Sequence, residues 1–416
     1  MKSLQTLCKP RKSTFNLSRR DVVLDVSDLV NDTIDPGKFF AENFVTAGMR
    51  DLLVEGTKRL AGKSDQGVFV LSQAMGGGKT HNMITLALLA KHPDHRKKVL
   101  EETDHKDLGA VRVIGFTGRE TDSPLGIWGA LADQLGKKDH FKDYYSPLQA
   151  PGVSAWIQLL QGEPLLILLD ELPPYLDNAK SKTIGNSDLS RVTATALANL
   201  LSALSKSELS NVCVVISDLK ATYEGGSAQL NKALDDFQNE VGRSAMTLEP
   251  VGLNTNELYH ILRTRIFETL PSEDETLEIA KAYAQAVKDA KQMDITHASP
   301  DAFASQLRDS YPFHFSIKDL YARFRENPGF QQTRGLIRFM RVVVARLWES
   351  GKAGQVALIH PYDIDLNDEA TKSEIRSINP TFENAISHDI AGGGVSVAEN
   401  LDKNSPGETT DAQDAA

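Results

Sequence analysis

The chain has 416 residues, 41% of them hydrophobic and 25% charged, which is enough for about two to three domains with buried cores. It lacks a run of about 18 apolar residues, so no membrane-spanning helix is expected. Its formal net charge of -10 argues against a surface coated in basic side chains for binding nucleic acid, although not against a local basic face. Two cysteines, Cys8 and Cys213, are too few for a disulfide framework or a cysteine-rich metal site and fit a reducing cytoplasm, where we expect the protein to be located.

Residues 1–34 form the first predicted segment, a basic N-terminal arm. The first 20 residues contain no acidic side chain and several basic ones: Lys2, Lys9, Arg11, Lys12, Arg19 and Arg20. A secretory signal needs a continuous apolar stretch, which is absent here, whereas a transit peptide remains compatible with the composition. We expect a frayed arm. Within residues 21–66, the spacing of the apolar residues predicts mostly helix.

Residues 35–251 are predicted to form an α/β domain. Five short apolar runs have the length of buried strands: residues 67–71, 111–116, 165–169, 212–216 and 246–248. Helices are predicted between them at residues 83–90, 125–135, 153–160 and 191–207. Strands that alternate with helices indicate a parallel sheet covered on both faces, and ligands of such sheets bind at the carboxyl ends of the strands.

The remainder of the chain is predicted to be helical and then disordered. Beyond about residue 252 the strand signals stop, and the helical patterns cover residues 254–269, 275–292, 317–325 and 333–350. We therefore expect a separate helical domain over residues 252–390. Residues 391–416 are polar and acidic with few large apolar side chains, so we expect them to form a disordered tail.

The first predicted strand leads directly into a glycine-rich loop. The sequence of the loop is Gln73-Ala74-Met75-Gly76-Gly77-Gly78-Lys79-Thr80. Glycines let backbone N–H groups point inward around a phosphate, the lysine reaches the β- and γ-phosphates, and the threonine hydroxyl binds magnesium. The usual pattern begins with a glycine where this chain has Gln73. A plain glycine turn is the alternative, but the order of strand, three glycines, Lys-Thr and helix favours a phosphate loop.

The predicted strand at residues 165–169 ends in two carboxylates, Asp170 and Glu171. Unpaired charges beside an entirely apolar strand are costly, and a metal ion and a water molecule would offset that cost. We expect Asp170 to hold magnesium and Glu171 to orient and deprotonate an attacking water. The alternative is a strand end that merely meets solvent. Pro173 and Pro174 follow, and we expect them to prevent a helix there and to stiffen the loop.

Several polar residues are secondary candidates. Ser217 and Asp218 end the fourth strand and either hold the attacking water or the γ-phosphate or simply cap the strand. Arg243 precedes the fifth strand and is either an arginine finger that acts on the nucleotide of a neighbouring subunit or a surface arginine. Arg334 and Arg338 lie one helical turn apart and either reach phosphates from the helical domain or belong to a solvated face.

These motifs, in this order, resemble the AAA+ division of P-loop ATPases, whose helical lid carries a Gly-x-x-Arg motif like that at residues 335–338. More narrowly, the chain resembles a poorly characterised bacterial and archaeal ATPase family found in defence gene clusters beside DNA methylases and helicases. The resemblance spans about residues 35–400, and the residues that carry it are 39–40, 46, 76–81, 170–176, 311–314, 328–331, 333–335, 359–361 and 363–365.

The resemblance implies an AAA+-like core followed by a helical lid, with ATP and Mg2+ as cofactors. The implied nucleotide-binding residues are Gly76, Gly77, Gly78, Lys79, Thr80 and His81. Together with Thr80, Asp170 would hold magnesium, and Glu171 would be the catalytic base. By the same resemblance, Ser217 would be the first sensor, Arg338 the second sensor, and Arg243 the arginine finger.

The implied role is that of an ATP-hydrolysing motor or switch subunit in a DNA-modification or phage-defence complex. A homo-oligomer is expected if Arg243 acts on a neighbouring subunit, and DNA methylases or helicases are the expected partners. Two other classes remain open. One is a nucleotide-bound scaffold or switch with little hydrolysis, although a pure sensor needs no base such as Glu171. The other is a structural subunit that binds DNA through the arginines of residues 334–346, with an affinity that depends on salt.

Overall fold

The chain divides into two compact units, which we describe separately. The computed structural model describes residues 2–17, 24–72, 76–100, 105, 107–119, 122–218, 228, 231–232, 235, 245–249, 256–290, 298–327, 329–405 and 410–415. The sheet unit comprises Val23–Phe40 and Val45–Gly252. The helical unit comprises Met1–Val22, Ala41–Phe44 and Leu253–Ala416.

A parallel sheet is the centre of the sheet unit. Its strands are β2 (Val68–Ser72), β3 (Arg112–Thr117), β4 (Leu165–Asp170), β7 (Val212–Asp218) and β8 (Met246–Leu248). Neighbouring strands pair in the order β3-β4-β7-β2-β8, and every pair is parallel. All five predicted strands are therefore confirmed. Because β7 lies between β4 and β2, the segments that follow these three strands emerge side by side at one edge of the sheet.

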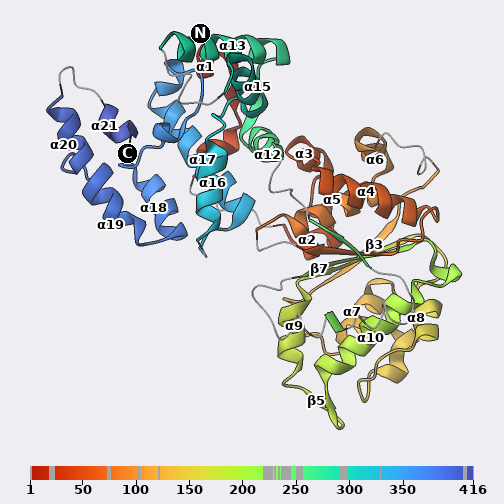
Figure 1. The fold of residues 1–416 in the computed structure, drawn as a ribbon. Helices are drawn as coiled ribbons and strands as arrows, with labels where there is room; N and C mark the ends of the chain where they lie inside the picture. The colour runs from red at the N-terminus through yellow and green to blue at the C-terminus, as the bar shows by residue number, and fades with distance from the viewer. Residues whose placement is uncertain are drawn as a thin grey trace. The chain divides into compact units, whose positions relative to one another are not determined.

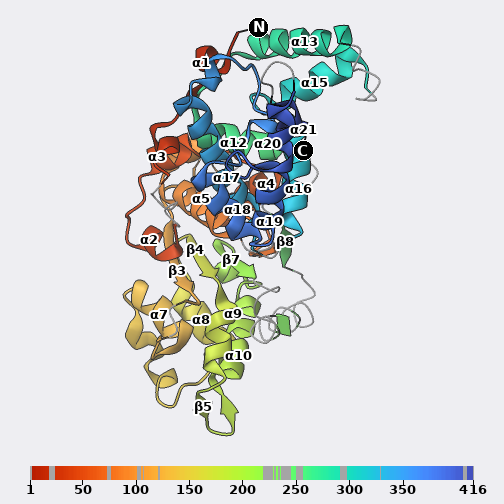
Figure 2. The same cartoon turned by 90° about the vertical axis from the view of Figure 1, so that its left-hand side faces the viewer.

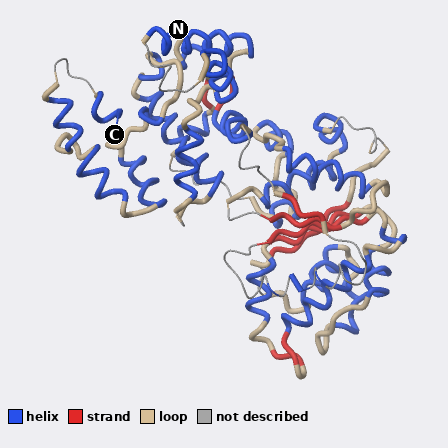
Figure 3. The backbone as a smooth tube through the Cα atoms, in the orientation of Figure 1, coloured by secondary structure: helices blue, strands red, loops and turns tan. Residues whose placement is uncertain are grey.

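Helices cover both faces of this sheet, as Figures 1 and 3 show. One face packs against α2 (Val26–Val30), α3 (Pro36–Ala41), α4 (Ala47–Leu60), α5 (Lys79–Lys91) and α6 (Pro93–Val99). The other packs against α7 (Gly126–Gln134), α8 (Val153–Leu160), α9 (Leu172–Ala179) and α10 (Leu189–Ala203). Side chains of a strand alternate between faces, so Leu166 and Leu168 of β4 enter one core, and Ile167 and Leu169 enter the other. This two-sided burial explains why the strands are continuous apolar runs.

The segment after the acidic pair differs from the prediction. Pro173 and Pro174 were expected to prevent a helix, but they lie in the first turn of α9, which begins at Leu172. Proline is compatible with this position because the first N–H groups of a helix have no partner within the helix. After α9, the short strands β5 (Thr183–Ile184) and β6 (Ser187–Asp188) form a hairpin that projects from the end of the unit distant from the sheet (Figures 1 and 2).

Short 3-10 helices complete the sheet unit: η2 (Lys138–Tyr144) and η3 (Ser207–Leu209).

The helical unit is built around α17 (Gln332–Glu349), whose apolar face is buried in a core of its own. Its remaining α-helices are α1 (Leu4–Leu7), α12 (Glu257–Ile266), α13 (Glu273–Asp289), α15 (Pro300–Ser310), α16 (Ile317–Arg325), α18 (Glu369–Ile378), α19 (Phe382–Ala385), α20 (Val397–Lys403) and α21 (Asp411–Ala415). Shorter elements are β1 (Lys9–Pro10), β9 (Phe267–Thr269), the 3-10 helices η1 (Lys12–Phe15), η4 (Lys352–Gly354) and η5 (Pro361–Asp363), and the π-helical η6 (Ile386–Ile390). Among the described residues, no helix has the length and apolarity to cross a bilayer.

The described residues of the predicted N-terminal arm are folded, in contrast to the frayed segment expected from the sequence: residues 2–17 belong to the helical unit, and α2 belongs to the sheet unit. Strand β1 pairs antiparallel with β9, with Lys9 opposite Thr269 and Pro10 opposite Phe267. The Leu4 side chain is fully buried in the core of the helical unit. Burial of apolar side chains outweighs the basic composition that suggested an exposed arm. The strand β9 also lies where only helix was predicted.

The C-terminal tail is likewise structured, although a disordered segment was predicted. Its helix α20 begins with a capping box formed by Ser396 and Glu399. The Glu399 carboxylate also accepts hydrogen bonds from the backbone N–H groups of Gly392 at 3.1 Å and Gly394 at 2.8 Å, and from the Asn367 side chain at 2.9 Å. A polar segment can therefore order around one buried carboxylate, even though it has few large apolar side chains.

Candidate functional site

The predicted phosphate loop, acidic pair and polar strand end meet at the carboxyl edge of the sheet. In the strand register, Leu71 of β2 lies opposite Ser217 of β7, and Leu169 of β4 lies opposite Ile216. The carboxyl ends of these three strands are thus neighbours in space although far apart in sequence. The site is assembled by the parallel pairing of β4, β7 and β2.

The described part of the glycine loop has the backbone that such a loop requires. Gly76 and Gly78 have φ values of 80° and 90°, in the left-handed region that glycine adopts without strain. Helix α5 begins at Lys79, whose side chain is buried, and Gly78 occupies the N-cap position. The Asn82 amide donates a hydrogen bond to the Gly78 carbonyl at 2.9 Å and holds the turn onto the helix. Gln73, the departure from the usual pattern, lies outside the described residues.

Asp170 is the buried centre of the site. The Thr80 hydroxyl donates a hydrogen bond to Asp170 Oδ2 at 2.7 Å, and the Ser217 hydroxyl donates one to Asp170 Oδ1. Burial raises the pKa of the Asp170 carboxyl, and the negative charge of Glu171 acts in the same direction, whereas the two hydroxyls and the Lys79 ammonium oppose the rise. The carboxylate is therefore desolvated and its charge is only partly compensated by the protein.

Glu171 is held in an unusual backbone conformation. Its φ of 49° and ψ of 41° lie in the left-handed region, which costs a residue with a side chain about 1–3 kcal/mol. Its N–H donates a hydrogen bond to Ser217 Oγ at 2.9 Å. Ser217 thus bonds to Asp170 through its hydrogen and to Glu171 through its oxygen, and fixes the positions of the two acidic residues relative to β7.

A residue that sequence reasoning missed, Arg119, reaches the same site. It follows β3, and its Nε forms an ion pair with Glu171 Oε2. The preceding residue, Gly118, donates its N–H to the Asp170 carbonyl at 2.8 Å. A Cβ on Gly118 would lie 1.9 Å from the Glu171 carbonyl oxygen, so only glycine allows this close approach. The signal available in the sequence was the Thr117-Gly118-Arg119 segment at the end of a predicted strand.

The other predicted site residues have different surroundings. The His81 ring, in the first turn of α5, packs against Phe39 with the ring centroids 4.8 Å apart. Arg338 pairs with Glu374 at 2.5 Å and donates to the Ser377 hydroxyl at 3.0 Å, all within the helical unit. Arg243 lies outside the described residues, as does the side chain of Asp218.

Two arginines near Arg338 on α17 also have partners within the helical unit. Arg341 donates to the Ser13 carbonyl at 2.7 Å, and Arg346 pairs with Asp368 at 2.9 Å.

The oxygen atoms at this edge of the sheet suit a magnesium ion. Mg2+ prefers oxygen ligands and is usually held by one or two carboxylates together with hydroxyls, water and phosphate oxygens. Thr80 Oγ1 and Asp170 Oδ2 lie 2.7 Å apart, and burial raises the pKa of Asp170, a shift that a cation bound beside the carboxylate would oppose. Among the described residues, this edge of the sheet included, no group of three or more His, Cys, Asp or Glu side chains is arranged to hold a metal ion, so a magnesium ion here would depend on the threonine hydroxyl, water and phosphate oxygens as further ligands.

Comparisons with known proteins agree with the division of the chain. A family model described as the DUF499 N-terminal domain matches residues 20–112 and 120–247. A second model, described as the DUF499 second domain, matches residues 253–404. The two matches meet where the sheet unit ends and the long C-terminal part of the helical unit begins. No curated protein matches the chain.

Proposed function

The chain therefore belongs to the DUF499 family, and from this premise we propose that it is a magnesium-dependent ATPase of the AAA+ type. The observation that carries the proposal is the cluster of Thr80, Asp170, Ser217 and Glu171 at the carboxyl ends of β2, β4 and β7. A glycine loop with left-handed glycines and a buried lysine adjoins this cluster. Each part suits one requirement of phosphoryl transfer.

In the proposed mechanism, the loop glycines and Lys79 bind the phosphates, and the lysine neutralises charge on the β- and γ-oxygens. Thr80 and Asp170 would hold Mg2+, which supplies compensation for the negative charge that develops on the phosphate oxygens. Glu171 orients the attacking water and accepts its proton. Ser217 positions Glu171 through the backbone hydrogen bond, so that the base keeps its place beside the γ-phosphate.

The biological part of the proposal rests on the resemblance of the motifs. We propose a motor or switch subunit of a DNA-modification or phage-defence complex in the cytoplasm, with DNA methylases or helicases as partners. Homo-oligomerisation is proposed because Arg243 precedes the last strand of the sheet, where an arginine can act on the nucleotide of a neighbouring copy. Arg338 is proposed as the second sensor, although its ion pair with Glu374 would first have to open.

A second candidate function is a nucleotide-bound switch with little hydrolysis. It is favoured by one observation: Arg119 pairs with the carboxylate of Glu171, which would otherwise be available to water. With its catalytic base held in this way, the protein would hydrolyse ATP slowly until the ion pair opens. A third candidate, DNA binding through the arginines of α17, has less support because Arg338, Arg341 and Arg346 have partners within the helical unit.

Phosphate release from ATP by the purified chain, compared with Glu171→Gln, tests the proposal. We expect magnesium-dependent turnover that falls about 100-fold or more in the variant, because general-base catalysis contributes about 10²–10⁴-fold. Binding of ATP should be unchanged, and Asp143→Asn, a change at an exposed carboxylate, serves as the matched control. Turnover that rises more than linearly with protein concentration supports a site completed between copies.

Other outcomes of the same measurement separate the candidates. ATP binding without turnover in either protein supports the switch. Failure of both proteins to bind ATP would contradict the whole proposal.

A further inference from the structure

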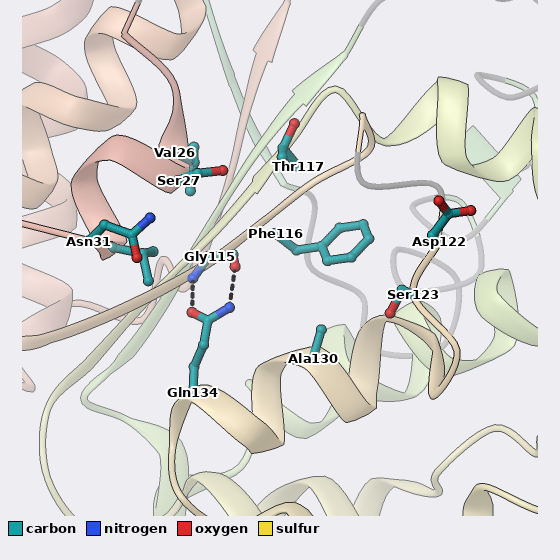
Figure 4. A pocket seen from close by; sticks show the side chains of 11 residues that line it. Val26, Ser27, Asn31, Gly115, Phe116, Thr117, Asp122, Ser123, Ala130 and Gln134 are labelled. Atoms are coloured by element: carbon teal, nitrogen blue, oxygen red, sulfur yellow. Dashed lines mark hydrogen bonds between the residues drawn. The ribbon is translucent and has the colours of Figure 1, made fainter.

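A pocket of about 330 Å3 opens beside the edge strand β3 of the sheet unit. Its walls come from α2, β3, the start of the segment that leads into α7, and α7 itself (Figure 4). Because β3 is the first strand in the order β3-β4-β7-β2-β8, no strand of the described residues pairs with it on this side. The pocket occupies part of the space in which such a strand would lie.

At the floor of the pocket, the backbone N–H and carbonyl groups of Gly115 in the edge strand both have hydrogen-bond partners. The Gln134 amide accepts a hydrogen bond from the Gly115 N–H at 2.9 Å and donates one to the Gly115 carbonyl at 2.7 Å (Figure 4). A Cβ on Gly115 would lie 2.3 Å from Val26 Cγ1, so α2 can approach only because this residue is glycine. Gln134 therefore blocks the addition of a peptide strand at this position and leaves a pocket suited to a small group.

The lining of the pocket favours a cation. Of the described residues that line it, Asp122 is the one that carries a charge. Among the described residues, no side-chain partner is found for Asp122, Asn31 or Ser27. A phosphate group would be repelled by Asp122, whereas an ammonium or guanidinium group would form a charge-assisted hydrogen bond with it.

The polar groups stand at opposite ends of the pocket. In Figure 4, Asn31 lies on one side of the Gly115 backbone, and Asp122 with Ser123 lies on the other. Aliphatic side chains of Val26, Val30 and Ala130 also line the pocket. This arrangement suits a ligand with a cationic head for Asp122, a short alkyl stem, and an amide or hydroxyl group for Asn31.

The pocket is also continuous with the segment that restrains Glu171. Thr117, which lines the pocket, lies opposite Asp170 in the strand register, and the next residue, Gly118, is bonded to the Asp170 carbonyl. Arg119, the partner of Glu171, is the next residue along the chain. The end of β3 therefore contacts both the pocket, through Thr117, and the acidic pair, through Gly118 and Arg119.

We propose that this pocket binds an arginine- or lysine-like ligand, and that its binding draws Arg119 away from Glu171 and activates ATP turnover. The activation part rests on the proposed ATPase function, whereas the binding part does not. The ligand is either a free small molecule or a side chain on a partner peptide, since both present the same cationic head and alkyl stem. The pocket volume of about 330 Å3 is sufficient for one such group.

Binding is tested with the full chain by calorimetric titration. The probes are agmatine, as a free guanidinium compound, and an acetylated and amidated Gly-Arg-Gly peptide, as the peptide-borne form. The same peptide with citrulline, a neutral isostere of arginine, is the matched control. We expect at least one cationic probe to bind, the citrulline peptide not to bind, and Asp122→Asn to weaken binding by about tenfold or more. The control variant is Asp139→Asn, at an exposed carboxylate outside the pocket lining.

Coupling to Glu171 is tested by two readouts. Hydrogen exchange of peptides that cover residues 116–124 should increase when the probe binds, whether or not the chain hydrolyses ATP. If the chain does hydrolyse ATP, turnover should rise several-fold with the probe, and this rise should be absent in Asp122→Asn. Absence of binding by both cationic probes, or binding that survives Asp122→Asn unchanged, overturns the site. Probe binding without any change in hydrogen exchange overturns the coupling. Probe binding by a chain that does not hydrolyse ATP supports the binding pocket and contradicts the ATPase proposal.

Discussion

At the scale of single residues, the surroundings of Glu171 determine how readily it can act as a base. Three constraints act on it: a left-handed backbone, the hydrogen bond from its N–H to Ser217, and the ion pair with Arg119. The first two fix the main chain and leave the carboxylate free to turn. The third occupies one carboxylate oxygen. The Arg119 side chain is 52% exposed, so the pair is screened by solvent and is worth at most about 1 kcal/mol.

The weak ion pair predicts a modest gain of activity in Arg119→Gln. Removal of an interaction worth about 1 kcal/mol or less should raise basal ATP turnover by up to about fivefold, because more of the Glu171 carboxylate is available to the water. Steady-state phosphate release at saturating ATP measures this effect. Arg112→Gln, at an exposed arginine of the preceding strand β3, is the control. Lower turnover in Arg119→Gln would mean that Arg119 positions the base or the nucleotide.

The buried Asp170 carboxyl predicts a dependence of stability on pH. Burial raises its pKa in the folded chain above the ordinary value of 3.8, so the folded state binds this proton more tightly than the unfolded state. Stability contributed by this group is present at low pH and is lost as the pH rises through the folded-state pKa. Asp170→Asn should therefore raise the Tm of the sheet unit at pH 7 and abolish turnover. Thermal scans of wild type and variant from pH 5 to pH 8 measure the difference in Tm. Equal Tm values would contradict the prediction, because burial of the Asp170 charge would then not destabilise the folded state.

At the scale of elements, the strands of the parallel sheet were predictable, whereas the short strands outside it were not. The runs that became β2, β4 and β7 are apolar throughout because helices cover both faces of the sheet, and those that became β3 and β8 are interrupted by the exposed residues Arg112 and Thr247. By contrast, β1 and β9 have two and three residues and exist only because they pair with each other. Segments of two or three residues are too short to show the alternation of apolar and polar residues that is typical of a strand, and their pairing is set by the surrounding core.

The same distinction applies to the candidate site. Lys79, Thr80, Asp170 and Glu171 follow strands in a recognisable order, and the parallel pairing of the strands brings them together. Arg119 could not be assigned to Glu171 because its partner depends on which strand lies next to β4, and strand order is not written in local sequence. The place of Arg338 was equally hidden, since its partners Glu374 and Ser377 come from a different helix, α18.

The hydrogen bonds to Glu399 from the loop before α20 predict that this region loses stability at low pH. The hydrogen bonds from residues 392–396 and Asn367 hold the pKa of Glu399 at about 2, although the removal of its carboxylate from water opposes this shift. The stabilisation is fully present above the ordinary value of 4.5 and is lost as the pH falls towards 2. Glu399→Gln should destabilise this region by about 1–3 kcal/mol at neutral pH.

Hydrogen exchange of peptides from residues 386–405 measures the change, with Glu383→Gln, at a more exposed carboxylate, as the control. Equal protection in wild type and Glu399→Gln would show that the loop is ordered without this carboxylate.

At the scale of the whole molecule, the two units do not correspond to two continuous stretches of the chain. The helical unit contains the N-terminal residues, the short stretch Ala41–Phe44 and the long C-terminal part. Arg11 donates a hydrogen bond to the Ala41 carbonyl at 2.9 Å, and Phe44 stacks on His260 with the centroids 4.8 Å apart. The family match to residues 253–404 therefore covers most, but not all, of the helical unit.

This composition predicts that the N-terminal residues stabilise the helical unit. Leu4 is completely buried in its core, so Leu4→Ala should cost about 2–5 kcal/mol. Lys12→Ala, at an exposed position of the same segment, should have little effect. Chemical denaturation followed by the fluorescence of Trp348, the tryptophan of the helical unit, measures the difference if the other two tryptophans are replaced by phenylalanine. Equal midpoints for Leu4→Ala and Lys12→Ala would contradict the prediction.

The pairing of β1 with β9 also has a consequence for biogenesis. During synthesis, Lys9 and Pro10 leave the ribosome before the sheet unit, and their partner strand is made only after the sheet unit has been translated. The segment that carries β1 must therefore remain unpaired, with Leu4 and Cys8 exposed, while the sheet unit folds. A nascent chain halted before residue 267 would present a finished α/β unit joined to an unpaired basic segment whose exposed apolar side chains chaperones can bind, and the helical unit would close only once β9 has emerged.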